Sequence, residues 1–315
     1  MTRVVHVLVW LALAVVLVVN VASAYVRLAQ QGLGCVPWPQ CYGQTAPQDA
    51  GAVPSEASPH FYVRAVHRFS ASIAAVLLVT IAFLGWGRWA GRGPRVGAIT
   101  LLVLAGGLTW LGIRTPSAAP AVTLGNVLGG MAMIAALAWL AAWQPRASGP
   151  ARVGWVAWTA LALVTLQLAL GALVNARYAA GACIGLPDCA GSWWPQGAPA
   201  SAFDIFRPTD VPIAASEAAA RQAVHMAHRL VGLATAVGVA AVVLGVLRRR
   251  DGPRVAAAFL AALLAAQLAL GAQMVEAGAP LAAATLHNML ANLLVATLAW
   301  IVCRGTRDAR GKEQR

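Results

Sequence analysis

Charged side chains are scarce in this sequence. Asp, Glu, Lys and Arg make up 10% of the 315 residues, whereas about a quarter is usual in soluble domains. This shortage excludes an ordinary soluble globular protein, because most of the chain has too few charges to face water. Hydrophobic residues make up 60% instead, and they gather in runs of about 20 residues, the length of a helix that crosses a bilayer.

These apolar runs are long enough to cross the membrane as helices and too long for the strands of a membrane barrel. The predicted fold is an all-α integral membrane protein with eight transmembrane helices. The first run also resembles a signal peptide, but its apolar stretch is longer than is usual for one. The expected spans are Val4–Val26, Arg64–Trp86, Val96–Ile113, Ala121–Trp143, Val153–Ala176, Gln222–Leu247, Val255–Val275 and Leu281–Cys303.

Basic residues are concentrated in alternate connections. They gather between the second and third spans, the fourth and fifth, the sixth and seventh, and after the eighth. Short loops rich in arginine stay on the cytoplasmic side, which predicts a multi-pass protein of the plasma membrane. Both termini are expected inside and the long loops 28–63 and 178–221 outside. The net charge of +13 is then mainly a signal of topology, and nucleic acid is not an expected partner.

Cysteines occur as two pairs in the long loops. Cys35 and Cys41 have the same spacing as Cys183 and Cys189, with five residues between the members of each pair. On an oxidising outer face such pairs are typical of disulfides. A metal site is the competing interpretation, although no histidine lies between the members of either pair. Cys303 is expected to be an unpaired core residue.

Several short motifs occur twice. Each half has one long outer loop with one cysteine pair, and Thr123–Asn126 (TLGN) matches Thr285–Asn288 (TLHN). We expect a duplicated unit, with an N-terminal four-helix bundle at 1–146, a C-terminal one at 147–315, and pseudo-symmetry between them. In each half a His-Arg pair follows a glutamate by eleven residues: Glu56 with His67-Arg68, and Glu217 with His228-Arg229.

Histidines near the outer ends of spans are the candidate site residues. An ionisable side chain within the membrane is costly and marks a functional candidate. His228 and His287 belong to the same half at similar depth, and two facing imidazoles in a bundle are a common way to hold haem iron. The alternative for a membrane histidine is an interhelical hydrogen bond. His67 has the same place in the first half, His225 is expected beside His228 or at the interface, and the role of His60 is left open.

The motifs together resemble those of the haem A synthase family over nearly the whole chain. They are the loop Gly32–Gly43 (GLGCVPWPQCYG), the two His-Arg pairs, the Leu-Gly-Ala segments and the late TLHN. The resemblance implies an oxidoreductase whose C-terminal bundle binds haem b through His228 and His287. The N-terminal bundle, with His67, would oxidise a ring methyl of haem O to a formyl group for cytochrome oxidase. Arg68 and Arg229 are expected to meet haem propionates.

Partners implied by the resemblance are the substrate haem O, haem O synthase, oxidase assembly factors and membrane lipid, and a homo-oligomer is compatible with it. Two positions depart from the family pattern. Arg64 stands where a glutamate is usual, for which Glu56 is the candidate replacement, and Gly125 stands where a second N-terminal histidine is usual. An active enzyme is the preferred hypothesis. The alternative is a non-catalytic haem-binding, electron-transfer or assembly relative that uses only the C-terminal site.

Overall fold

The computed structural model describes residues 3–33, 59–86, 92–115, 117, 119–143, 154–209, 217–249 and 252–313. Within these residues the chain forms eight helices that are long and apolar enough to cross a membrane, and it forms no strand. The predicted fold class and number of spans are therefore confirmed.

Several helices extend beyond the spans expected from the sequence. α2 begins at Pro59 rather than Arg64, and proline suits the first turn of a helix. α6 begins at Glu217, whose carboxylate favours the N-terminal end of a helix, and α8 continues to Glu313. The helices are α1 (Arg3–Gln30), α2 (Pro59–Trp86), α3 (Arg92–Ile113), α4 (Pro120–Ala142), α5 (Trp155–Ala176), the 3-10 helix η1 (Ala200–Phe203), α6 (Glu217–Leu247), α7 (Arg254–Glu276) and α8 (Leu281–Glu313).

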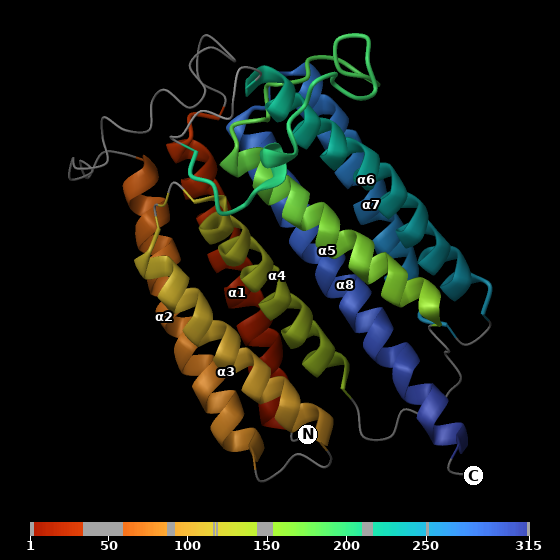
Figure 1. Cartoon of the computed structure of the whole chain (residues 1–315). Coiled ribbons are helices and arrows are strands. Elements are labelled where there is room, and N and C mark those ends of the chain that lie inside the picture. The colour runs from red at the N-terminus through yellow and green to blue at the C-terminus, as the bar shows by residue number, and fades with distance from the viewer. Residues whose placement is uncertain are drawn as a thin grey trace.

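The long helices pack as two rings of four (Figure 1). In the N-terminal ring α1 and α3 each contact α2 and α4, and in the C-terminal ring α5 and α7 each contact α6 and α8. The rings meet where α8 packs against α4 and α1, and where α4 packs against α5. This packing is compatible with two four-helix bundles that divide near residue 146. That boundary and the pseudo-symmetry of the two halves stay predictions.

A polar contact joins the two rings inside the otherwise apolar interface. Asn20 of α1 donates from Nδ2 to Oδ1 of Asn292 on α8 at 2.7 Å, and Asn292 is 1% exposed. A Cβ on Gly130 of α4 would lie 2.7 Å from Oδ1 of Asn20, so a side chain at this position would displace the amide. Hydrogen bonds of this kind supply specificity to helix packing in membranes.

Large apolar side chains cover the outward faces of the helices, most clearly on α2 and α3. Phe69, Phe83, Val103 and Ile113 are exposed, and Phe83 is 82% exposed. Such a surface would be unfavourable in water but suits contact with lipid. The interior is also aliphatic, with Leu137 of α4 and other leucines and isoleucines fully buried.

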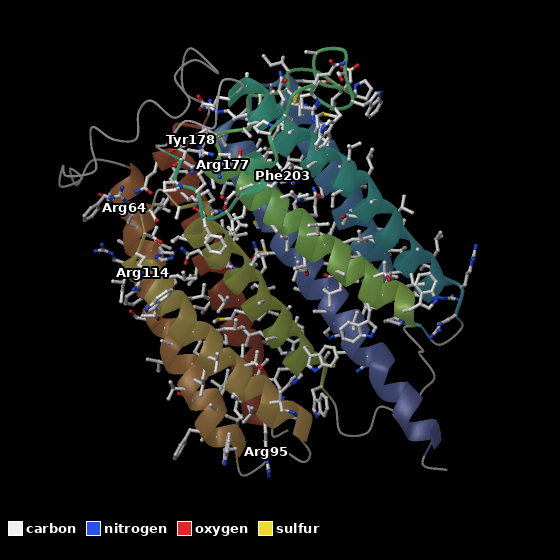
Figure 2. The ribbon with its side chains drawn as sticks, in the orientation of Figure 1. Arg64, Arg95, Arg114, Arg177, Tyr178 and Phe203 are labelled. Carbon is white, nitrogen blue, oxygen red and sulfur yellow. A yellow bond between two sulfur atoms is a disulfide. The ribbon has the colours of Figure 1, made fainter. Side chains whose placement is uncertain are left out.

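The segment 177–209 folds over one end of the bundle, which we call the loop end. Arg177, Tyr178 and Phe203 lie there, Arg64 and Arg114 lie toward the same end, and Arg95 lies at the opposite one (Figure 2). Both chain ends also lie opposite the loop end (Figure 1). Which side of the membrane each end faces stays a prediction.

Candidate functional site

A cavity of about 480 Å³ lies among the helices of the C-terminal ring. Most of its lining is aliphatic and comes from α5, α6, α7 and α8, while Leu28 of α1 closes one side and Trp193 of the loop segment lies over it. The polar groups in the lining include Arg27, Gln167, Asn175, His228, Gln267 and His287. The two histidines selected from the sequence therefore share one cavity. An apolar pocket with a few convergent polar groups is typical of a cofactor site.

His228 on α6 is held by two residues of α5. Its Nε2 lies 3.3 Å from Nε2 of Gln167. A Cβ on Gly171 would lie 3.1 Å from Cε1 of the His228 ring. Gln167 and Gly171 are one helical turn apart and so lie on the same face of α5. Glycine at 171 lets the imidazole lie against the α5 backbone.

His287 on α8 is held in the same way by α7. Its Nε2 lies 3.0 Å from Nε2 of Gln267, and a Cβ on Gly271 would lie 3.4 Å from its Cε1. Neither pairing of a glutamine with a histidine was expected from the sequence. The available signal was the Gln-Leu-Ala-Leu-Gly-Ala motif, which occurs in the helix preceding each histidine helix. In both places the motif supplies a glutamine and a glycine to one imidazole.

Several buried polar atoms of the site lack a partner among the described residues. Nδ1 of both histidines and Oε1 of both glutamines are buried without a hydrogen-bond partner in the described part of the chain. Unpaired buried polar atoms are costly, so they indicate where a ligand completes the site. No cluster of three His, Cys, Asp or Glu that could hold a bare metal ion occurs in the described ranges. Two imidazoles match the axial positions of haem iron, because the porphyrin supplies the other ligands.

His225 and Arg229 attach the loop segment to α6. Nδ1 of His225 donates to the carbonyl oxygen of Ala179 at 2.8 Å, and the ring is 6% exposed. His225 thus anchors the chain just after α5. The guanidinium of Arg229 donates to three carbonyl oxygens, those of Cys183 at 2.9 Å, Gly185 at 3.0 Å and Asp188 at 2.9 Å. The propionate contact expected for Arg229 stays a prediction.

Cys183 and Cys189 form a disulfide, with their Cα atoms 4.9 Å apart, which confirms the expected pairing. Both cysteines are buried together with Met226 of α6. The disulfide and Arg229 therefore fix the same short loop over the cavity. Cys35 and Cys41 lie outside the described residues.

The beginning of the loop segment is tied to the N-terminal ring. Arg177 donates to the carbonyl oxygen of Asp204, and burial lowers the pKa of its guanidinium. Tyr178 packs with Leu28 of α1 and with Leu33, which follows α1, and burial raises the pKa of its hydroxyl. The end of α1 is consequently part of the structure around the C-terminal cavity.

The N-terminal candidates lie elsewhere. His67 is half-buried on α2, Arg68 beside it is exposed, and neither lines the cavity described above. Arg64, one turn earlier, has its Nε buried without a partner in the described part of the chain. Glu56 and the side chain of His60 lie outside the described residues. The structure thus separates His67 from the pair His228 and His287.

The position on α4 that matches His287 is filled from the neighbouring helix. A Cβ on Gly125 would lie 2.8 Å from Cδ1 of Leu111 on α3, and a Cβ on Gly129 would lie 2.8 Å from Cδ2 of Leu108. Asn126 donates to the hydroxyl of Thr115 at 3.0 Å. Leucines of α3 therefore occupy the space where α4 lacks a side chain.

Two polar residues of the C-terminal cavity were not selected from the sequence. Arg27 lies one turn before the end of α1, and its Nε is buried without a partner in the described part. Asn175 lies near the end of α5, is 7% exposed, and leaves both Oδ1 and Nδ2 without a partner there. Polar residues in apolar spans are costly, and that cost was the available signal for Asn175, whereas Arg27 directly follows the expected first span and gave no such signal.

Comparison with known proteins agrees with this site. A heme A synthase from Shewanella oneidensis is 31% identical over 317 aligned residues, covering 93% of this chain and 95% of the relative. A heme A synthase from Rhizorhabdus wittichii is 26% identical, covering 92% of this chain and 91% of the relative. The family model described as cytochrome oxidase assembly protein matches residues 6–299. The family inferred from the motifs is thereby confirmed, and the chain belongs to the COX15-CtaA family of cytochrome oxidase assembly proteins.

Proposed function

We propose that this chain is a haem A synthase, which oxidises a ring methyl of haem O to a formyl group and so supplies haem A to cytochrome oxidase. The observation that carries the proposal is the pair His228 and His287, which share one apolar cavity and are each backed by a glutamine and a glycine. The family match and the relatives named heme A synthase support the same activity.

The C-terminal cavity would hold haem b. His228 and His287 would hold the haem iron, which suits electron transfer rather than binding of a substrate. The bound haem would supply one-electron redox chemistry. The task of the protein is to orient the two rings and to keep water out. Leu186 and Pro187 of the disulfide-closed segment, and Trp193 shortly after it, line the cavity and would keep water out.

The N-terminal ring would take haem O. His67 on α2 is the candidate ligand, and Glu56 is the candidate acid or base for the methyl group. The exposed apolar surface of α2 and α3, which includes Phe69 and Phe83, offers a hydrophobic substrate an approach from the bilayer. Because Leu111 fills the space beside Gly125, where a second histidine is usual in the family, a single histidine would hold the substrate and leave one face of the iron open.

The packing of Leu111 against Gly125 also favours a second function. A chain without a second N-terminal ligand would serve as a non-catalytic haem-binding, electron-transfer or assembly protein that uses only His228 and His287. Arg64, in place of the usual glutamate of the family, points in the same direction. The enzyme is preferred because the family pattern extends over both halves of the chain.

We further propose that the protein lies in the plasma membrane with the loop end outside. Haem O synthase and oxidase assembly factors are the expected partners, since haem O must pass from one membrane protein to the next. Self-association into a homo-oligomer is compatible with the apolar outer surface.

Haem extraction tests the proposal. The chain is co-expressed with a haem O synthase in a host that lacks haem A, and extracted haems are separated by chromatography and identified by mass. Haem A in the extract, lost in His67→Ala, supports the enzyme. Haem B alone, bound in a way that depends on His228 and His287, would replace the enzyme with the non-catalytic function. A His6→Ala variant is the matched control, because His6 lies at the opposite end of the bundle, where it accepts a hydrogen bond from Trp10.

A further inference from the structure

The lining of the C-terminal cavity carries positive charge and no negative charge. Arg27 and Arg229 both contribute to it, and no Asp or Glu of the described residues does. A buried cation without an anion is strongly unfavourable, and more so within a membrane. The cavity therefore favours a ligand that brings an acidic group of its own.

The two arginines are not equally available. Arg229 is already engaged, since its guanidinium donates to the carbonyl oxygens of Cys183, Gly185 and Asp188. Arg27 makes no such contact within the described part of the chain, and its Nε is buried there without a partner. Arg27 is consequently the cation that an acidic group in the cavity would meet.

Asn175 provides an independent observation at the same end of the cavity. Its side chain is 7% exposed and lines the cavity, and neither Oδ1 nor Nδ2 has a partner in the described residues. Leaving a buried amide unsatisfied is costly. A carboxylate accepts hydrogen bonds from both a guanidinium and an amide N–H, so one anionic group can satisfy Arg27 and Asn175 together.

The position of Asn175 relative to the histidines fits a particular ligand. Asn175 follows Gly171 by one helical turn, about 6 Å along α5 toward the loop end, and Gly171 is the residue that contacts the His228 ring. A flat ligand whose metal lies between His228 and His287 would thus present an edge toward Asn175 and Arg27. Haem carries its two propionate carboxylates on one edge.

We propose that Arg27 and Asn175 form a carboxylate-binding subsite for the propionates of the haem held by His228 and His287. The inference rests on the proposed haem site. It assigns protein residues to the edge of the haem that carries the carboxylates. It also assigns a residue of α1, in the N-terminal ring, to the ligand site of the C-terminal ring. The C-terminal half would then bind haem fully only in the presence of α1.

The test compares haem b with its dimethyl ester, in which both propionates are neutral. Full-length protein is purified without haem from haem-deficient cells and titrated with each ligand, with the low-spin optical spectrum as the readout. The unaltered chain should prefer the free acid. Arg27→Gln should weaken binding of the acid about tenfold, as expected for one charge-assisted hydrogen bond, and leave ester binding nearly unchanged. Asn175→Leu should act in the same direction with a smaller change.

Two further variants control for charge and folding. Arg27→Lys keeps the cation and should retain most of the preference for the acid. Arg114→Gln removes an equivalent charge toward the loop end, where Arg114 is exposed and stacks 3.7 Å above the Trp110 ring, and should leave both affinities unchanged. A cation near haem favours the reduced, less positive state, so Arg27→Gln should also lower the reduction potential, whereas Arg114→Gln should not.

The outcomes separate the subsite from the haem site itself. If the unaltered chain binds neither ligand in a low-spin form, the proposed haem site fails and the subsite with it. If the unaltered chain binds haem but Arg27→Gln keeps the full preference for the acid, only the subsite is overturned. Equal loss of both ligands in Arg27→Gln and Arg27→Lys would assign Arg27 a purely structural role and overturn the subsite as well.

Discussion

The last two helices of each ring make a contact between a glycine and a large side chain, but the helix that supplies the glycine differs between the rings. In the C-terminal ring, Gly271 of α7 lies against His287 of α8; in the N-terminal ring, Leu111 of α3 fills the space beside Gly125 of α4. Each contact pairs one glycine with one large side chain, but the large side chain comes from a different helix. Only the C-terminal ring therefore presents a possible iron ligand from its last helix. A repeated sequence motif can thus accompany two unequal sites.

Removing either histidine of the C-terminal pair should have the largest effect. His228→Ala and His287→Ala each delete one axial ligand, so we expect loss of the low-spin haem spectrum and of most bound haem in the purified protein. Haem-to-protein ratios from optical spectra of size-selected fractions provide the measurement. His67→Ala should leave this haem in place, and equal loss of haem in all three variants would contradict the assignment of separate sites.

A histidine placed on α4 tests this difference between the two rings directly. Gly125→His alone should be destabilising by about 1–3 kcal/mol, because its side chain would collide with Leu111 in a packed core. Combined with Leu111→Gly, the same histidine should be accommodated and should raise the haem content above that of the unaltered chain. Thermal unfolding and haem content are the two readouts. A single Gly125→His variant as stable as the double variant would show that Leu111 does not control this space.

The two cysteine pairs offer a smaller test of the same comparison. Replacing Cys183 and Cys189 by serine should lower stability by about 2 kcal/mol in the chain-entropy model and weaken haem b retention, because their loop lies over the C-terminal cavity. Replacing Cys35 and Cys41 should leave haem b retention unchanged. Haem loss during heating in detergent is the measurement, and equal haem loss in both variants would contradict it.

The smallest expected difference lies within the C-terminal ring. A methyl group at Gly171 would come within 3.1 Å of His228, a tight contact, whereas one at Gly271 would lie 3.4 Å from His287, an ordinary contact. Gly171→Ala should therefore weaken haem binding a few-fold by tilting one ring, and Gly271→Ala should change it little. Titration of haem-free protein with haem b measures both. A larger effect from Gly271→Ala would reverse the order that these distances predict.

The membrane helices could be predicted because length and composition suffice for them. Each expected span has its helix, and two of the boundaries that moved, at Pro59 and Glu217, moved to residues that favour helix N-termini. The family and the disulfide of Cys183 and Cys189 followed from local motifs. Gln167 and Gln267 stand in a repeated motif, but their pairing with the histidines could not be predicted, because it depends on which helix faces meet.

What the sequence by itself determined is local: eight apolar spans, histidines within them, one confirmed disulfide spacing and a family. The tertiary structure decided which of these residues meet. It brought Arg27 of α1 and Asn175 of α5 into the cavity of His228 and His287, and it placed Leu111 beside Gly125. Helices that are apolar all round carry little periodic signal of their inward face. Their neighbours are set by how small and large side chains of different helices pack together, and the sequence of one helix does not reveal this packing.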